Sequence, residues 1–156
     1  MPRPQRASPL PDPLLNHFRR IYASEARLAL ELDVLFRRTR WLPLRLALSD
    51  QRKETKRHVN RIAALLPDRS AGIGLDVVGV PDAGPDVDRW APLSAAAVVA
   101  DLLQAARAAL SLYGAALAAA TERGLEHVVR LLTSSLTEET ETEQRLAALA
   151  AEIPSE

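Results

Sequence analysis

Three glutamates occupy positions at which a helical pattern calls for apolar residues. Glu25 lies in a stripe of large apolar residues that recur at alternating steps of three and four, which is typical of the buried face of a helix. Glu54 and Glu139 interrupt two further stripes of this kind. A carboxylate inside an apolar core is costly unless it is paired, protonated or bound to a metal. The pattern therefore indicates a polar or metal-binding layer within a helical protein. The stripe around Glu25 consists of Phe18, Ile21, Leu28, Leu32 and Leu35.

A histidine is placed to join these carboxylates. His58 follows Glu54 by four residues, so both side chains lie on one face of a helix. This spacing is compatible with a pair of metal ligands and equally with an ion pair on the helix surface. If a metal is bound, iron and manganese are the natural candidates for an oxygen-rich site.

A metal-free interpretation of the same residues stands beside this one. The buried glutamates can be protonated or hydrogen-bonded core residues, with Gln51, Thr55 and Thr142 as partners. Helix rotation can also bring Glu54 or Glu139 to the surface. Further expectations follow from the same stripes: Tyr22 and Tyr113 belong to the core, whereas Glu138 and Glu141 are solvated.

Composition narrows the class of protein. The 156 residues suit one domain, and an apolar content of 47% with only 4% aromatic residues favours close-packed helices. No cysteine is present, which excludes disulfides and thiolate chemistry, and the zero net charge argues against nucleic-acid binding. The basic stretch from Arg52 to Arg61 is interpreted as a solvated helix face. Because Arg107 interrupts the most apolar stretch and residues 1–13 lack a signal-peptide core, a cytoplasmic protein without membrane contact is expected.

The chain is expected to form a single all-α domain after a flexible tail rich in Pro and Arg. Asp12 is the expected N-cap of the first helix, Ser94 that of the third, and Gly124 ends the third helix. The Gly- and Pro-rich connection between the second and third helices is long enough to cross from one end of a bundle to the other. This predicts a four-helix bundle of two helical hairpins joined by a long crossover. The predicted ranges are 1–12 for the tail, 13–38, 43–66, 94–123 and 125–153 for the helices, and 67–93 for the crossover.

An ordered set of short matches runs through all four predicted helices. With these residues the chain resembles the YciE/YciF-type ferritin-like proteins, a stress-linked bacterial family. The resemblance implies a ferritin-like bundle that forms a homodimer. The matching residues are Ile21 to Glu25, Glu54 and Thr55, Arg61 and Ile62, Tyr113 and Gly114, Leu131 and Leu132, Glu138 and Glu139, and Leu146.

The chain departs from this family pattern at several expected ligand positions. Gln51 stands where the pattern has a histidine, and Ala106 and Ala109 stand where it has two inward glutamates. Glu143 replaces an aspartate conservatively. A dinuclear centre needs carboxylates that bridge two ions, so the remaining set suits one cation at most. The residual metal candidates are Glu25, Glu54, His58, Glu139 and Glu143.

The resulting functional hypothesis is a ferritin-like bundle that has lost dinuclear metal chemistry. It is expected to act as a non-catalytic structural or stress-related interaction protein, without a cofactor. One alternative is a mononuclear iron or manganese protein, or a weak oxidoreductase, that uses the surviving ligands. Another is a small-ligand binder with a cavity near Ala106 and Ala109.

Overall fold

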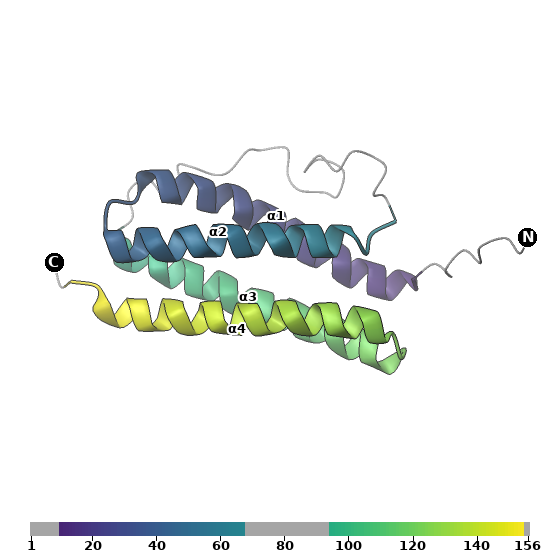
Figure 1. The fold of residues 1–156 in the computed structure, drawn as a ribbon. Helices are drawn as coiled ribbons and strands as arrows, with labels where there is room; N and C mark the ends of the chain where they lie inside the picture. Colours follow the sequence, from purple (N-terminus) through teal and green to yellow (C-terminus); the bar gives the residue numbers. More distant parts are fainter. Residues whose placement is uncertain (1–9, 68–93, 155–156) are drawn as a thin grey trace, which may run out of the picture.

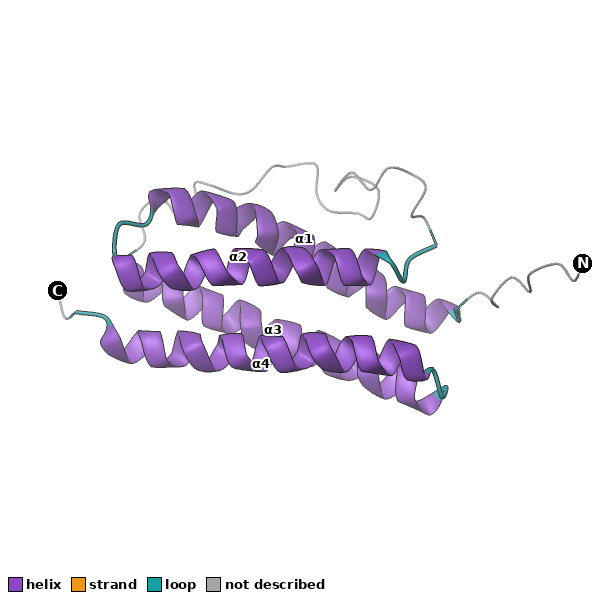
Figure 2. Ribbon diagram, viewed as in Figure 1, coloured by secondary structure: helices purple, strands orange, loops and turns teal. Residues whose placement is uncertain are grey.

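The computed structural model describes residues 10–67 and 94–154, and within these ranges the chain forms four long α-helices (Figures 1 and 2). The expected all-α class is therefore confirmed. The helices are α1 (Asp12–Arg38), α2 (Leu42–Ala63), α3 (Ala95–Glu122) and α4 (Glu126–Glu152).

The helices pack as two hairpins, α1 against α2 and α3 against α4 (Figure 1). Between the hairpins, α1 lies beside α3 and α2 lies beside α4. The starts of α2 and α3 share one apolar cluster and their ends share the other, so these two helices run in the same direction. The predicted crossover lies outside the described residues.

Most helix boundaries agree with the sequence expectations to within one residue. At the start of α1 the N-cap is Pro11 rather than Asp12, which is the first helical residue. The second helix was expected to reach Leu66 but ends at Ala63. The chain then makes one tighter turn, in which the N–H groups of Leu65 and Leu66 donate hydrogen bonds to the carbonyls of Ile62 and Ala63, three residues earlier. A helix seldom continues up to a proline, because the residue before Pro67 is pushed out of the helical region.

The turn between α3 and α4 is specified by one glycine. Gly124 has a φ of +66°, the left-handed conformation that favours glycine. Its N–H donates to the Thr121 carbonyl, and the Leu125 N–H donates to the Ala120 carbonyl. These two bonds form a Schellman motif, as expected for a glycine at this position. At the other end of α3, the Ser94 side chain accepts a hydrogen bond from Ala97 N, which confirms the predicted N-cap.

The apolar core is divided into two clusters by a polar layer. One cluster surrounds Phe18 and Tyr113, and the other surrounds Leu48 and Leu102. The residues between them are buried although they are polar or charged, and they come from α1, α2 and α4. The expected layer at mid-height of the bundle therefore exists. Its members are Glu25, Gln51, Glu54, Thr55, His58, Ser135, Glu139 and Thr142.

By length and composition, one helix among the described residues, α3, is apolar enough to cross a membrane despite containing Arg107. Its most apolar window has a mean hydropathy of 1.4, and 28% of that window is buried in the bundle. The core helix of a globular protein satisfies the same criterion.

Candidate metal centre in the polar layer

His58 forms the centre of the polar layer. Its side chain is fully buried, and its Nδ1 atom lies 3.1 Å from Oε1 of Glu139 and 3.3 Å from Oε1 of Glu25. These three residues come from α2, α4 and α1, so three different helices supply one constellation. One ligand atom from each residue lies within 4.8 Å of the other two, and all three residues are buried. The sequence predicted all three as candidate ligands.

The other side of the imidazole ring is held by a second carboxylate. His58 Nε2 lies 2.7 Å from Oε2 of Glu138. Arg61 fixes that carboxylate with two hydrogen bonds, of 2.7 Å from Nη1 and 3.1 Å from Nη2. An arginine that grips a carboxylate with both nitrogens defines its position well. Glu138 and Arg61 therefore orient the His58 ring from outside the core.

In this orientation of the ring, a positive charge is needed between Nδ1 of His58 and the carboxylates of Glu25 and Glu139. When Nε2–H donates to Glu138, the neutral ring presents the lone pair of Nδ1 to two carboxylate oxygens, which is repulsive. A cation between these three atoms removes the repulsion. It can be a proton, which makes His58 an imidazolium, or a metal ion that all three atoms bind.

The proton-bound form is favourable in this environment. Burial alone lowers the pKa of His58, but hydrogen bonds and charge from Glu139 and Glu25 outweigh it and raise the pKa to about 10. Burial raises the pKa of Glu139 to about 7, the hydrogen bond to His58 opposes this rise, and the charge of Glu25 adds to it. In the metal-free protein at neutral pH, His58 is therefore an imidazolium.

Glu54 belongs to the layer, but its negative charge is already balanced by an arginine. Its Oε2 accepts hydrogen bonds of 3.0 Å from the Thr142 hydroxyl and 2.8 Å from Arg145 Nη2. Burial raises the pKa of Glu54, and these two partners limit the rise. Glu54, His58 and Glu138 form a second group that satisfies the distance criterion for metal ligands. Because arginines already pair with both of its carboxylates, this group lacks the unbalanced charge of the first.

Three buried polar atoms of the layer and its surroundings have no hydrogen-bond partner among the described residues. They are Glu25 Oε2, Tyr113 Oη and Gln51 Oε1. Burial and the charges of Glu25 and Glu139 strongly raise the pKa of Tyr113, so its hydroxyl stays protonated. Tyr113 also meets the His58 ring edge to face, at 5.8 Å between ring centroids. Unpartnered buried groups are rare in native proteins and typically mark the place of a water, an ion or a ligand.

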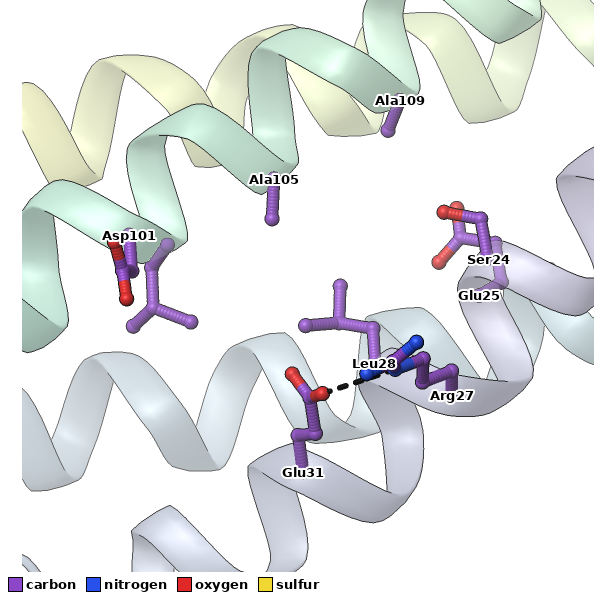
Figure 3. A pocket seen from close by; sticks show the side chains of 9 residues that line it. Ser24, Glu25, Arg27, Leu28, Glu31, Asp101, Ala105 and Ala109 are labelled. Atoms are coloured by element: carbon purple, nitrogen blue, oxygen red, sulfur yellow. Dashed lines mark hydrogen bonds and ion pairs between the residues drawn. The ribbon is translucent and has the colours of Figure 1, made fainter. Parts of the chain in front are cut away.

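A partly enclosed pocket of about 240 Å³ reaches Glu25 from the side of α3 (Figure 3). Ala105 and Ala109 line its α3 wall, and Leu28 and Glu31 line its α1 wall. The position of this pocket refines the cavity that the sequence suggested. Ala109 lines it as expected, whereas Ala106 packs inside an apolar cluster.

Several sequence-based assignments require correction. Glu143 does not join the layer: it lies 3.3 Å from Arg107 Nε in an exposed ion pair. Glu138 was expected to be solvated, yet it is partly buried and binds His58. Sequence reasoning also missed Arg61 and Arg145 as partners of the buried carboxylates. The spacing of Arg61, three residues after His58 on the same helix face, was the available signal.

The residues present fit one metal ion and do not fit two. Nδ1 of His58 lies 3.1 and 3.3 Å from one oxygen of each carboxylate, separations that match two ligands of a single ion with bonds of about 2.1 Å, and ligand atoms of all three residues lie within 4.8 Å of one another. A second ion needs further bridging or terminal carboxylates. Ala106 and Ala109 supply none from α3, and Glu54 and Glu138 are paired with arginines. We therefore derive no dinuclear chemistry for this chain.

The chain has no significant match to any protein-family profile, curated protein or solved structure.

Proposed function

We propose that this protein is a four-helix-bundle metal-binding protein that holds one divalent cation between Glu25, His58 and Glu139. The observation that carries the proposal is the position of Nδ1 of His58, at 3.1 and 3.3 Å from two buried carboxylate oxygens of different helices. Iron and manganese fit a set of one imidazole and two carboxylates. This function corresponds to the mononuclear alternative from the sequence.

The outer contacts of His58 support this proposal. Histidines that bind metals usually donate their other N–H to a carboxylate, which fixes the ring and raises its basicity. Glu138 occupies that position here, and Arg61 anchors it. The unpartnered Oε2 of Glu25 provides a further ligand atom within the same carboxylate.

The proposal is tested by measuring the metal content of the full chain. After removal of metal by a chelator, the protein is loaded in turn with Fe²⁺ under anaerobic conditions, Mn²⁺ and Zn²⁺, and analysed by plasma mass spectrometry. We expect about one ion per chain, and at least a tenfold loss of affinity in Glu25→Gln and Glu139→Gln, because each variant removes a charged ligand. Glu143→Gln is the matched control on α4 and should bind normally.

Two results would contradict the proposal. Less than a tenth of an ion per chain, with no change in melting temperature on adding chelator, would exclude a metal centre. Two ions per chain would restore the dinuclear interpretation despite Ala106 and Ala109.

A metal-free structural protein is the second candidate function, and it was the leading expectation from the sequence. The observation in its favour is that every carboxylate of the layer contacts a cationic side chain when His58 is an imidazolium. In this case the layer specifies helix register and the protein acts through its surface, as a stress-related interaction protein of the ferritin-like type. The absence of bound metal in the experiment above would favour this candidate. A homodimer, a cytoplasmic location and the absence of nucleic-acid or membrane partners also remain predictions, and sedimentation analysis tests the first.

A further inference from the structure

The zero net charge of the whole chain conceals a separation of charge between the two hairpins. Residues 10–67, which contain α1 and α2, have twelve basic and six acidic residues, a net charge of +6 with histidine neutral. Residues 94–154, which contain α3 and α4, have four basic and eight acidic residues, a net charge of −4. Figure 1 shows that each hairpin forms one side of the bundle. An anionic surface therefore attracts the first side and repels the second.

Positive charge is concentrated at the turn between α1 and α2. Residues 34–49 contain four arginines and no acidic residue. Arg37, Arg40 and Arg45 are exposed, and within the described part of the chain no ion pair neutralises Arg37 or Arg40. The Arg45 guanidinium lies over the Phe36 ring, 4.9 Å from its centroid. This turn is therefore a local cationic surface on a chain without net charge.

Two leucines protrude from the same turn. Among the described residues, the exposed large apolar side chains are Leu42 and Leu46, at 62% and 59%. They lie four residues apart at the start of α2, so they share one face of the helix. Trp41 precedes them and is partly buried against the apolar cluster that contains Leu48. The end of the first hairpin thus presents apolar and cationic groups side by side.

This combination identifies the kind of partner. Charge alone suits any polyanion, but the sugar–phosphate backbone of a nucleic acid offers nothing to two exposed leucines. A second copy that pairs this surface with itself would bring arginines against arginines, which is unfavourable. An anionic membrane satisfies both groups, because its headgroups attract the arginines and its acyl chains accept protruding leucines without a shaped pocket. Tryptophan also suits the boundary between lipid and water.

We propose that the α1–α2 turn is a peripheral docking site for an anionic lipid surface. Leu42 and Leu46 insert among the lipids. Arg37, Arg40 and Arg45 bind the headgroups. The expectation of no membrane partner was based on net charge and on the lack of an uninterrupted span, and peripheral contact requires neither a net positive chain nor a span. The inference goes beyond the proposed metal function and does not depend on it.

The proposal is tested by cosedimentation of the full chain with vesicles. Vesicles of phosphatidylcholine alone are compared with phosphatidylcholine vesicles that contain about 30% phosphatidylglycerol. We expect binding to the mixed vesicles and at least tenfold weaker binding to the neutral ones, because several arginines contribute at the anionic surface. High salt should weaken binding to the mixed vesicles, since it screens exposed charges.

Two double variants test the leucines. Leu42→Ser combined with Leu46→Ser should weaken binding to the mixed vesicles at least tenfold, because no large apolar side chain remains to insert. Leu42→Phe combined with Leu46→Phe keeps apolar side chains at both positions and should retain binding. Both positions are exposed, and far-UV circular dichroism and thermal melting establish that the variants fold.

Two further double variants test the location of the charge. Arg37→Gln combined with Arg40→Gln should weaken binding to the mixed vesicles about tenfold. Arg123→Gln combined with Arg130→Gln removes the same charge from exposed positions of the second hairpin and should leave binding unchanged. An equal loss in the two variants would assign binding to net charge and overturn the proposed site.

Other results would also overturn the proposal. These are equal binding to the two kinds of vesicle, no binding at millimolar lipid, and full binding by the serine variant. Duplex DNA bound as tightly as the mixed vesicles, by the wild-type protein and the serine variant alike, would show a site for polyanions in general. A dimer that dissociates in the serine variant, without vesicle binding, would make a second copy the partner.

The two proposals fail separately. His58 is fully buried in the polar layer and does not belong to the α1–α2 turn. His58→Gln should therefore abolish metal binding and preserve vesicle binding, and the serine variant should have the opposite effect. A chain that binds anionic vesicles but no metal would refute the proposed function alone.

Discussion

Nε2 of His58 lies 2.7 Å from Oε2 of Glu138, and this contact determines which ring nitrogen faces the other buried carboxylates. Arg61 holds Glu138 with two hydrogen bonds, so the orientation of a fully buried ring is set by a partly exposed ion pair. The charge balance of the whole polar layer follows from this one contact. Either a proton or a metal ion must occupy the space at Nδ1.

Removal of Glu138 should weaken metal binding although Glu138 is not among the three proposed ligands. In Glu138→Ala the His58 ring loses its outer acceptor, and we expect a loss of about 10- to 100-fold in Mn²⁺ affinity. Glu138→Gln keeps an acceptor oxygen and should lose less. Glu141→Ala, at an exposed position on the same helix, is the control. Equal affinities in all four proteins would show that Glu138 does not position His58.

The stability of the metal-free protein should fall as the pH rises from neutrality. The folded pKa of His58, about 10, lies above its ordinary value of 6.5, so its contribution is complete below 6.5 and is lost as pH rises through 10. Glu139, with its pKa raised to about 7, acts in the same direction between its ordinary value of 4.5 and about 7. Urea unfolding midpoints in chelator, at a series of pH values up to about 10, measure this effect.

Two comparisons identify His58 as the source of this pH dependence. His58→Gln should show a much smaller decline above neutral pH. Saturating Mn²⁺ should also remove the decline, because the ion requires the deprotonated ring and binds more strongly as protons leave. A decline that is the same in the wild-type protein and in His58→Gln would assign the effect to other groups.

Arg145 should contribute more to stability than an exposed arginine of the same bundle. In Arg145→Met the buried carboxylate of Glu54 loses its 2.8 Å cationic partner, and we expect a loss of about 1–2 kcal/mol in the free energy of unfolding. The half-exposed position of Arg145 keeps this below the cost at a fully buried pair. Arg107→Met breaks the exposed pair with Glu143 and should cost about 0–1 kcal/mol. Equal effects in urea titrations would mean that Glu54 is neutral in the folded protein.

Two glycines of the second hairpin should respond to alanine in opposite directions. Gly124 adopts a φ of +66°, so Gly124→Ala should destabilise the protein by about 1–2 kcal/mol. Gly114 lies inside α3, and a Cβ added there would meet no heavy atom within 4 Å beyond its chain neighbours and the nearby backbone of its own helix. Gly114→Ala should therefore stabilise the protein by about 0.5–1 kcal/mol. Thermal melting of the two variants measures both shifts, and a shift of the same sign in both would contradict this assignment of their roles.

The sequence alone was sufficient for the helices and for the existence of a polar layer. Helix formation depends on local apolar spacing and on end signals such as Ser94 and Gly124, which act within one or two turns. Glu25, Glu54 and Glu139 stood out because each interrupts an apolar stripe, and burial of all three confirms that inference. The α2 terminus was placed three residues too late because the apolar pattern continues beyond the point at which Pro67 already prevents helix continuation.

Only the tertiary structure decided how these charges are paired. Helix rotation and axial register determine which neighbours across the bundle meet, and a shift of one residue turns a side chain by about 100° around its helix. This rotation brings Glu138 onto His58 and Arg145 onto Glu54, and it leaves Glu143 with Arg107 at the surface. It also turns Ala105 and Ala109 toward the pocket at Glu25. A sequence records which residues share one helix face, whereas contacts between faces of different helices exist only after the bundle has packed.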